Sequence, residues 1–152
     1  MTEIHTTYLM TLSAELSDMQ TIGATPNGHR RIALVGSGKF EGPKLRGTIL
    51  PGGTDWLIVR PDGAQMIDVR LVLETDDRAA IGMTYRGVRH GPDEVMAKLS
   101  AGEPVDPSLY YFRVAITFET AAQKYDWLNR IVAVGTGRRL PEGPIYDIFE
   151  IL

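Results

Sequence analysis

Hydrophobic and polar residues alternate along much of this chain with a period of two, the pattern of half-buried β-strands. In the N-terminal segment, every second position on one face is apolar: Tyr8, Met10, Leu12, Ala14 and Leu16. The alternation is clearest from Met66 to Thr75, where Ile67, Val69, Leu71 and Leu73 share the apolar face. We therefore expect two long strands here.

The remaining elements follow from similar patterns and from turn residues. We expect further strands at Arg30–Val35 (with Ile32 and Leu34 on the apolar face), Thr48–Leu50, Trp56–Arg60, Ala79–Arg86, Leu109–Thr120, Ile131–Gly135 and Ile145–Ile151. Gly23–Gly28 predicts a loop. The one convincing helix is Pro92–Leu99, because Pro suits the first helical position and acidic residues follow it. Ala121–Leu128 is a candidate for a single helical turn.

Glycine and proline divide the stretch from Gly36 to Arg70 and exclude a helix there. Each interior glycine would cost a helix about 1 kcal/mol, and each interior proline about 3 kcal/mol. Strands that bend at glycines are typical of small barrels and strongly coiled sheets. The pattern therefore predicts an all-β protein, an antiparallel barrel or sandwich with one short helix, in a single domain over residues 1–152.

Composition and charge limit the class of partner. The chain is 43% hydrophobic and 23% charged, as in ordinary globular proteins, and its net charge of -3 comes without a basic stripe. We therefore expect no nucleic-acid partner. No apolar run approaches the about 20 residues that span a bilayer, and residues 1–20 lack a signal-peptide pattern. We expect a cytoplasmic protein without a membrane partner.

The familiar motifs of cofactor and nucleophile chemistry are missing. Gly36-Ser37-Gly38-Lys39 lacks the spacing and following helix of a phosphate loop. His5, His29 and His90 have no partner at metal-ligand spacing, and there is no cysteine. No serine lies in a nucleophile elbow. We therefore expect no metal site and no cofactor.

Two of the predicted strands carry charges opposite their apolar faces: Asp68 and Arg70 on one, Arg113 and Glu119 on the other. In one interpretation these side chains face solvent and form weak cross-strand ion pairs. In the other, part of this polar face lines a barrel lumen, where an arginine fork would bind a carboxylate or a carbonyl. Both interpretations remain open.

Asp55-Trp56, after the Pro51-Gly52-Gly53 turn, also has two interpretations. The aspartate could cap the turn while the indole plugs one end of a barrel. Alternatively, Asp55 beside an indole at a barrel mouth could be a general base with a raised pKa. Tyr85 lies on an apolar face and could offer its hydroxyl inside, and Asn129 is either a turn former or an amide aimed at a ligand.

A series of short motifs extends in order over nearly the whole chain. They are Gly38-x-Phe40-x-Gly42-Pro43-x-Leu45-x-Gly47, Pro51-Gly52-Gly53-x-Asp55-Trp56, Asp68-x-Arg70, Thr75-Asp76-Asp77, Tyr111-Phe112-Arg113, Phe118-Glu119-Thr120, Tyr125-x-Trp127-Leu128-Asn129 and Tyr146-Asp147. In these motifs the chain resembles the bacterial family called domain of unknown function 3237. The resemblance implies a small antiparallel β-barrel of calycin type, built as a meander, and no established activity. Arg78 and Leu71 depart from the family pattern, and Arg78, in place of the expected glycine, suggests a different turn.

Two functions of different classes are compatible with these patterns. The first is a barrel that binds a small organic acid or carbonyl compound and performs acid–base chemistry on it, with Asp55 and Tyr85 as candidate catalytic residues. Its candidate ligand-binding residues are Trp56, Asp68, Arg70, Arg113, Glu119 and Asn129. The second is a non-catalytic, self-associating barrel with a filled core. In either case we expect a homodimer, because exposed sheet edges tend to pair.

Overall fold

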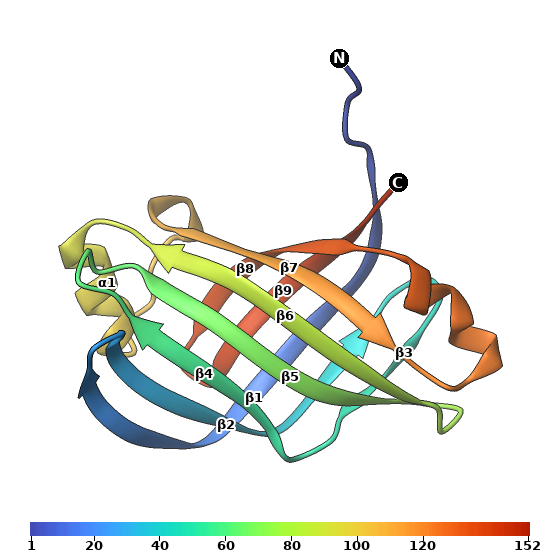
Figure 1. Cartoon of the computed structure of the whole chain (residues 1–152), viewed down its shortest axis with the longest axis horizontal. Coiled ribbons are helices and arrows are strands. Elements are labelled where there is room, and N and C mark those ends of the chain that lie inside the picture. Colours follow the sequence, from blue (N-terminus) through green and yellow to red (C-terminus); the bar gives the residue numbers. More distant parts are fainter.

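Nine antiparallel strands form one sheet that closes into a barrel (Figure 1). The computed structural model covers residues 1–152. The strands are β1 (Thr6–Thr25), β2 (Gly28–Glu41), β3 (Arg46–Ile49), β4 (Gly53–Val59), β5 (Gln65–Thr75), β6 (Ala80–His90), β7 (Tyr111–Glu119), β8 (Ala133–Leu140) and β9 (Gly143–Ile151). The predicted small antiparallel barrel is confirmed.

The ring closes because β1 pairs with both β2 and β9. The short strands β3 and β4 share one position in the ring, since each pairs with β2 on one side and β5 on the other. The other neighbours in the ring follow the chain order from β5 to β9. Because the sheet is closed, it has no long unpaired edge. The homodimer was expected because exposed edges tend to pair, so this reason no longer applies and the homodimer stays a prediction.

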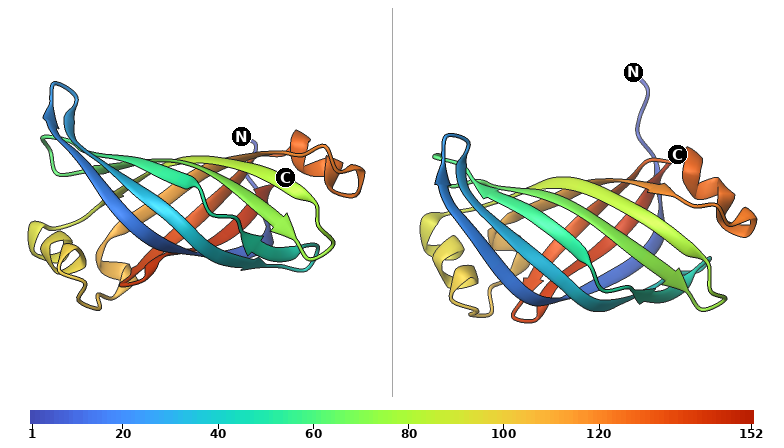
Figure 2. Two further views of the ribbon diagram at one scale, coloured as in Figure 1. Left: turned by 90° about the horizontal axis from the view of Figure 1, so that it is seen from below. Right: turned by 60° about the horizontal axis from the view of Figure 1, so that its bottom comes forward.

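The loop expected at Gly23–Gly28 is instead the tip of a long hairpin. β1 and β2 stay paired as far as Thr25 and Gly28, with Pro26 and Asn27 as the turn between them. This tip projects beyond the rest of the barrel (Figure 2). Its residues are largely exposed on both faces, so no apolar alternation marked it as strand.

Short helical segments lie at the two ends of the barrel. The predicted helix is confirmed as α1 (Asp93–Ser100), which follows Pro92 and lies at the same end of the barrel as the tip of the β1–β2 hairpin (Figures 1 and 2). Two 3-10 segments add to it: η1 (Pro107–Leu109) and η2 (Gln123–Arg130), which extends the single predicted turn at the opposite end. None of the helices has the length and apolar character to cross a membrane.

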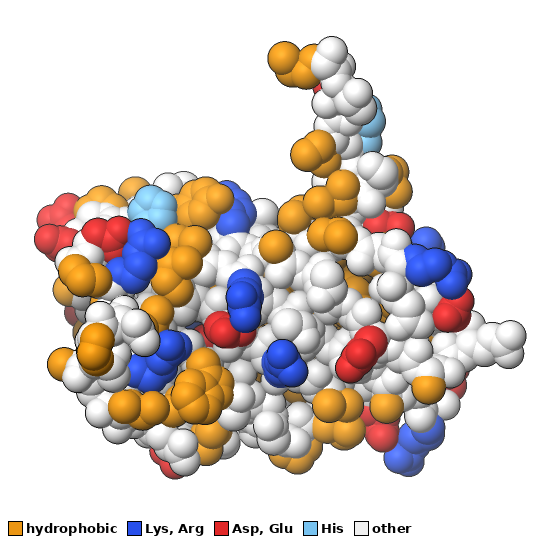
Figure 3. Space-filling model, viewed as in Figure 1, with side chains coloured by type: hydrophobic (Ala, Val, Ile, Leu, Met, Phe, Trp, Pro, Cys, Tyr) orange, Lys and Arg blue, Asp and Glu red, His pale blue; other side chains and the backbone are white.

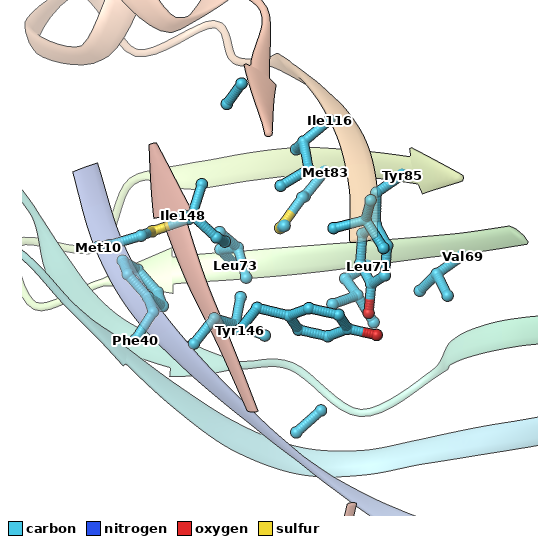
Figure 4. Packing of buried hydrophobic residues seen from close by; sticks show 14 of the residues in the cluster. Met10, Phe40, Val69, Leu71, Leu73, Met83, Tyr85, Ile116, Tyr146 and Ile148 are labelled. Atoms are coloured by element: carbon cyan, nitrogen blue, oxygen red, sulfur yellow. The ribbon is translucent and has the colours of Figure 1, made fainter. Parts of the chain in front are cut away.

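A single cluster of 27 buried residues fills most of the lumen. Figure 4 shows Met10, Phe40, Leu73 and Ile148 packed together, from four different strands. Tyr125 and Leu128 of η2 belong to the same cluster. The barrel is therefore solidly packed toward its η2 end.

Arg78 occupies the turn between β5 and β6 with φ of 70°, in the left-handed region. That is the conformation a glycine would adopt most easily at this position. Arg78 therefore adopts the backbone conformation expected for glycine, and the different turn that the arginine suggested is not formed. Thr75 Oγ1 supports the turn by accepting the Ala79 N–H and donating to Asp77.

The alternation along β5 predicts opposite responses at neighbouring positions. Leu73 is fully buried, and Leu73→Ala should lower the free energy of unfolding by about 2 to 5 kcal/mol because it leaves a cavity. Val72 is 44% exposed, and Val72→Ala should change it by less than about 0.5 kcal/mol. Urea denaturation of both variants measures the difference; equal losses would contradict the assignment of the two faces.

Candidate functional site

A cavity of about 190 Å³ occupies the α1 end of the barrel lumen. Most of its lining is apolar and includes Leu57, Ile67 and Val69 from β4 and β5. Leu99 and Ser100 of α1 border it, as does Met19 of the β1–β2 hairpin, which is 40% exposed. The cavity therefore reaches solvent between the hairpin and α1.

Asp55 is the only carboxylate that lines this cavity, and an interruption in the sheet holds it there. Trp56 and Leu57 pair with β2 but not with β5, so the ladder between β4 and β5 opens for two residues. In this gap Asp55 Oδ1 accepts the backbone N–H of Asp68 at 3.0 Å. At the same interruption, the Arg30 guanidinium donates a hydrogen bond to the backbone carbonyl oxygen of Trp56. Side chains thus replace the missing ladder bonds and fix the direction of the carboxylate.

Burial raises the pKa of Asp55 from its ordinary 3.8 to about 6. The hydrogen bond from the Asp68 amide and the positive charges of Arg89 and Arg30 oppose this shift, while the charge of Asp68 adds to it. A carboxyl group with this pKa changes protonation just below neutral pH. It can therefore both accept and return a proton under physiological conditions.

Two buried tyrosines lie beside Asp55. Tyr85 on β6 and Tyr146 on β9 meet edge to face, with ring centroids 5.2 Å apart, and their hydroxyl oxygens converge (Figure 4). Burial raises the pKa of both hydroxyls, and the charge of Asp55 raises them further. Both tyrosines therefore stay protonated, and each keeps one O–H group that can donate a hydrogen bond.

The backbone makes room for this aromatic packing at Gly137, which pairs with Tyr146. A Cβ atom at Gly137 would lie 2.6 Å from the ring of Phe112. Because the glycine has none, the Phe112 ring can pack against Tyr146 with centroids 5.3 Å apart.

Three arginines also line the cavity: Arg31 of β2, Arg89 of β6 and Arg139 of β8. Arg89 donates from Nε to Gln65 Oε1 at 2.9 Å and lies over the Phe112 ring, 5.3 Å from its centroid. Burial, followed by the charge of Arg139, lowers the pKa of Arg89 to about 10. Burial also lowers the pKa of Arg139. Arginine side chains keep their positive charge in proteins, so the cavity contains three cationic groups.

The charged residues that the sequence singled out on β5 and β7 lie on the outside of the barrel. Arg70, Arg113 and Glu119 are exposed, and Asp68 is half-buried with its Oδ1 3.5 Å from Nε of Arg86. Charged side chains of both signs spread over the outer surface (Figure 3). The lumen-facing interpretation is therefore wrong for these four residues, because the apolar positions between them take the inner face.

Trp56 and Asn129 also lie away from the cavity. Trp56 points outward, is 47% exposed and packs under Arg30, whose guanidinium carbon is 5.9 Å from the ring centroid. Asn129 belongs to η2 and fastens that segment to Thr120, accepting its N–H at 2.8 Å and donating to its carbonyl oxygen at 3.0 Å. Of the eight candidate residues, the structure brings Asp55 and Tyr85 together in one cavity.

The arginines and Tyr146 were missed, although a signal for the arginines was present. On β6 the inward positions continue past Tyr85 and Gly87 to Arg89, and on β8 they continue past Gly135 and Gly137 to Arg139. The expected strands ended at Arg86 and Gly135, and each therefore stopped two inward positions too early. On β2, Arg31, Ala33 and Val35 line the cavity, so the expected apolar face, Ile32 and Leu34, is the outer one.

No group of three or more histidine, aspartate or glutamate side chains comes together in a way that could hold a metal ion. The polar groups of the cavity are the carboxyl of Asp55, two phenols, three guanidinium groups and the hydroxyl of Ser100 at its border. This set suits hydrogen bonding and proton transfer to an organic molecule.

A closed antiparallel ring with one packed end and, at the other end, a mostly apolar cavity that holds a few charged groups defines a small calycin-like barrel. The chain belongs to the family described as "Protein of unknown function (DUF3237)", which matches residues 4–151. The resemblance in the local motifs is therefore confirmed over the full barrel.

Relatives of known structure share this barrel. The chain is similar to the conserved protein of unknown function RPA1785 from Rhodopseudomonas palustris, with a TM-score of 0.96 and 34% identity over 100% of both chains. A β-barrel-like protein from Acinetobacter baumannii AYE gives a TM-score of 0.87 at 42% identity, covering 99% of this chain and 98% of that one.

One relative has a named activity. The hydroalkoxylation enzyme phnH of Penicillium herquei is 30% identical over 122 residues, which are 80% of this chain and 66% of that protein.

The raised pKa of Asp55 predicts a pH-dependent cost to stability. Between about pH 4 and pH 6 the unfolded carboxyl is ionised while the folded one keeps its proton, so the free energy of unfolding falls as pH rises through this window. Asp55→Asn removes that loss and keeps an oxygen that can accept the Asp68 N–H. The variant should therefore be more stable than the wild type by about 2 to 3 kcal/mol at pH 7.5 and nearly equal at pH 4.

Urea denaturation at the two pH values measures this difference, and an NMR titration of the Asp55 carboxyl carbon measures the pKa itself. A titration midpoint near pH 4, with Asp55→Asn less stable at both pH values, would contradict the account.

Proposed function

We propose that this protein binds a small carbonyl compound in the lumenal cavity and transfers a proton to or from it, with Asp55 as the proton acceptor. The observation that carries the proposal is a lone carboxyl of raised pKa, fixed in a mostly apolar cavity beside two protonated tyrosines. A general base is most effective when its pKa lies near the working pH.

The chemistry follows from the positions of these groups. The Asp55 carboxylate takes a proton from the carbon next to the carbonyl group and becomes a neutral acid. The C–H electron pair moves into a new carbon–carbon double bond, and the carbonyl oxygen gains the negative charge of an enolate. Tyr85 and Tyr146 would donate hydrogen bonds to this oxygen, which favours the transition state. Return of the proton from Asp55 to carbon, or to another atom of the same molecule, completes the cycle.

The name of one relative supports catalysis over mere binding. Hydroalkoxylation adds an O–H bond across a carbon–carbon double bond, so a proton leaves oxygen and another reaches carbon. A carboxyl that accepts and returns a proton near neutral pH suits that class of step as well as enolisation. In both reactions Asp55 would accept a proton from the substrate and later return one.

The alternative, a non-catalytic barrel that self-associates, is favoured less. A structural barrel gains stability from a filled lumen, and an ionised carboxyl inside it is a cost. Here the η2 end is packed as a structural role requires, while the α1 end keeps a cavity that contains a carboxyl and three guanidinium groups.

Proton exchange with solvent tests the proposal without knowledge of the natural substrate. Phenylacetone incubated with the protein in D2O should lose its α C–H signals in the proton NMR spectrum faster than in buffer alone. The rate should rise as pH increases through about 6 and level off above it, because the ionised form of Asp55 is the base. Asp55→Asn should reduce the protein-dependent rate at least about 100-fold.

Asp76→Asn is the matched control, because Asp76 is exposed at the far end of the barrel, in a surface ion pair with Arg46. It should keep the wild-type rate. Protein-dependent exchange that survives in Asp55→Asn, or that ignores pH between 5 and 7, would refute the assignment of the base.

A further inference from the structure

The arginines that line the cavity are half-buried and have no acidic partner. The chain forms seven ion pairs, and both partners of every one of them keep at least part of their side chains in solvent. None of the seven involves Arg31, Arg89 or Arg139. Buried or partly buried cations are normally paired with a carboxylate, so this set calls for an explanation.

The neutral partners of these arginines do not satisfy them. Arg89 has the amide oxygen of Gln65, and Arg139 has the carbonyl oxygen of Leu140. Arg31 Nε is fully buried and has no hydrogen-bond partner. The guanidinium groups therefore retain donors that nothing in the chain accepts.

The charges also add up to an excess at one place. Three guanidinium groups share the cavity with the single carboxyl of Asp55, and the charges of Arg139 and Arg89 repel each other. Glu142 lies near enough to Arg139 to influence it but forms no ion pair with it. Even with Asp55 ionised, the cavity carries a surplus of two positive charges.

We propose that the cavity is built for a small organic acid, whose carboxylate binds the guanidinium groups of Arg31 and Arg139 while its apolar body lies against Leu57, Ile67 and Val69. This deepens the proposed function by naming the substrate class, and it rests on that function only for the identity of the site. Arginine suits the role because its planar fork binds both oxygens of a carboxylate.

The size and lining of the cavity limit the acid. A volume of about 190 Å³ with mostly apolar walls holds a molecule with one ring or a short branched chain, and one charged end. Because most of the lining is apolar, the favoured ligand has its carboxylate and its apolar body at opposite ends.

A matched pair of probes separates charge from shape. 3-Phenylpropionate and 3-phenylpropanamide share one skeleton, but only the first is an anion, and neither requires turnover. Titrated by isothermal calorimetry at pH 7.5, the acid should bind at least about tenfold more tightly than the amide. Arg31→Gln and Arg139→Gln should each weaken binding of the acid about tenfold or more and leave binding of the amide unchanged.

Arg86→Gln is the control variant, because Arg86 lies on the outer face of β6, three positions from Arg89. It should bind the acid as the wild type does. Should either cavity variant fail to fold, the Nε–Hε NMR signal of Arg31 in the wild-type protein still tests the contact. This signal should shift on addition of the acid and stay in place with the amide.

The outcomes distinguish this inference from the proposed function. Equal binding of acid and amide, or binding of neither, overturns the inference, whereas exchange of phenylacetone protons that depends on Asp55 would still uphold the function. Preference for the acid that survives in both Arg31→Gln and Arg139→Gln also overturns it. Selective binding of the acid through these arginines upholds it even if no proton exchange occurs.

Discussion

Closure of the sheet gives every strand one face toward the lumen and one toward solvent, and successive side chains must alternate between them. On β5 this constraint places Val69 inside and Arg70 outside, with no intermediate choice. The same constraint turns Asp55 inward and Trp56 outward, although the two are neighbours. Whether a residue can take part in a lumenal site is therefore decided by whether it falls on an inward or an outward position of its strand, and not by its chemistry.

The lumen is divided along its length by what the inward positions carry. Toward η2 they are large and apolar, and they pack into a continuous core. Toward α1 the same strands present Asp55, Arg89 and Arg139 to a cavity. The packed half supplies the stability of the barrel, and the polar half lowers it at neutral pH through the ionised form of Asp55. Such a cost is common where a binding or catalytic site has to be kept polar inside an apolar frame.

Much of the architecture could be predicted from the sequence, because it depends on local patterns. Alternation on β1, β5 and β7, the turns at proline and glycine, and the start of α1 were sufficient for the barrel and its helix. The exposed hairpin tip could not be found in this way, since neither of its faces is buried.

For the site, Asp55 and Tyr85 could be predicted, the first from its place after a turn and the second from an apolar face. The arginines were missed for two reasons. Arg89 and Arg139 lie where inward positions continue past the apolar run that defines a strand, and Arg31 lies on the inner face of β2, where the apolar pattern favoured the opposite face.

A crystal structure of the protein soaked with 3-phenylpropionate tests the central claim, that the lumenal cavity around Asp55 is a ligand site, most directly. The account predicts electron density for the acid inside the barrel, with its ring against Leu57 and Val69 and its carboxylate at Arg31 and Arg139. An acid bound on the outer face at Arg70 or Arg113, with only water in the cavity, would contradict it.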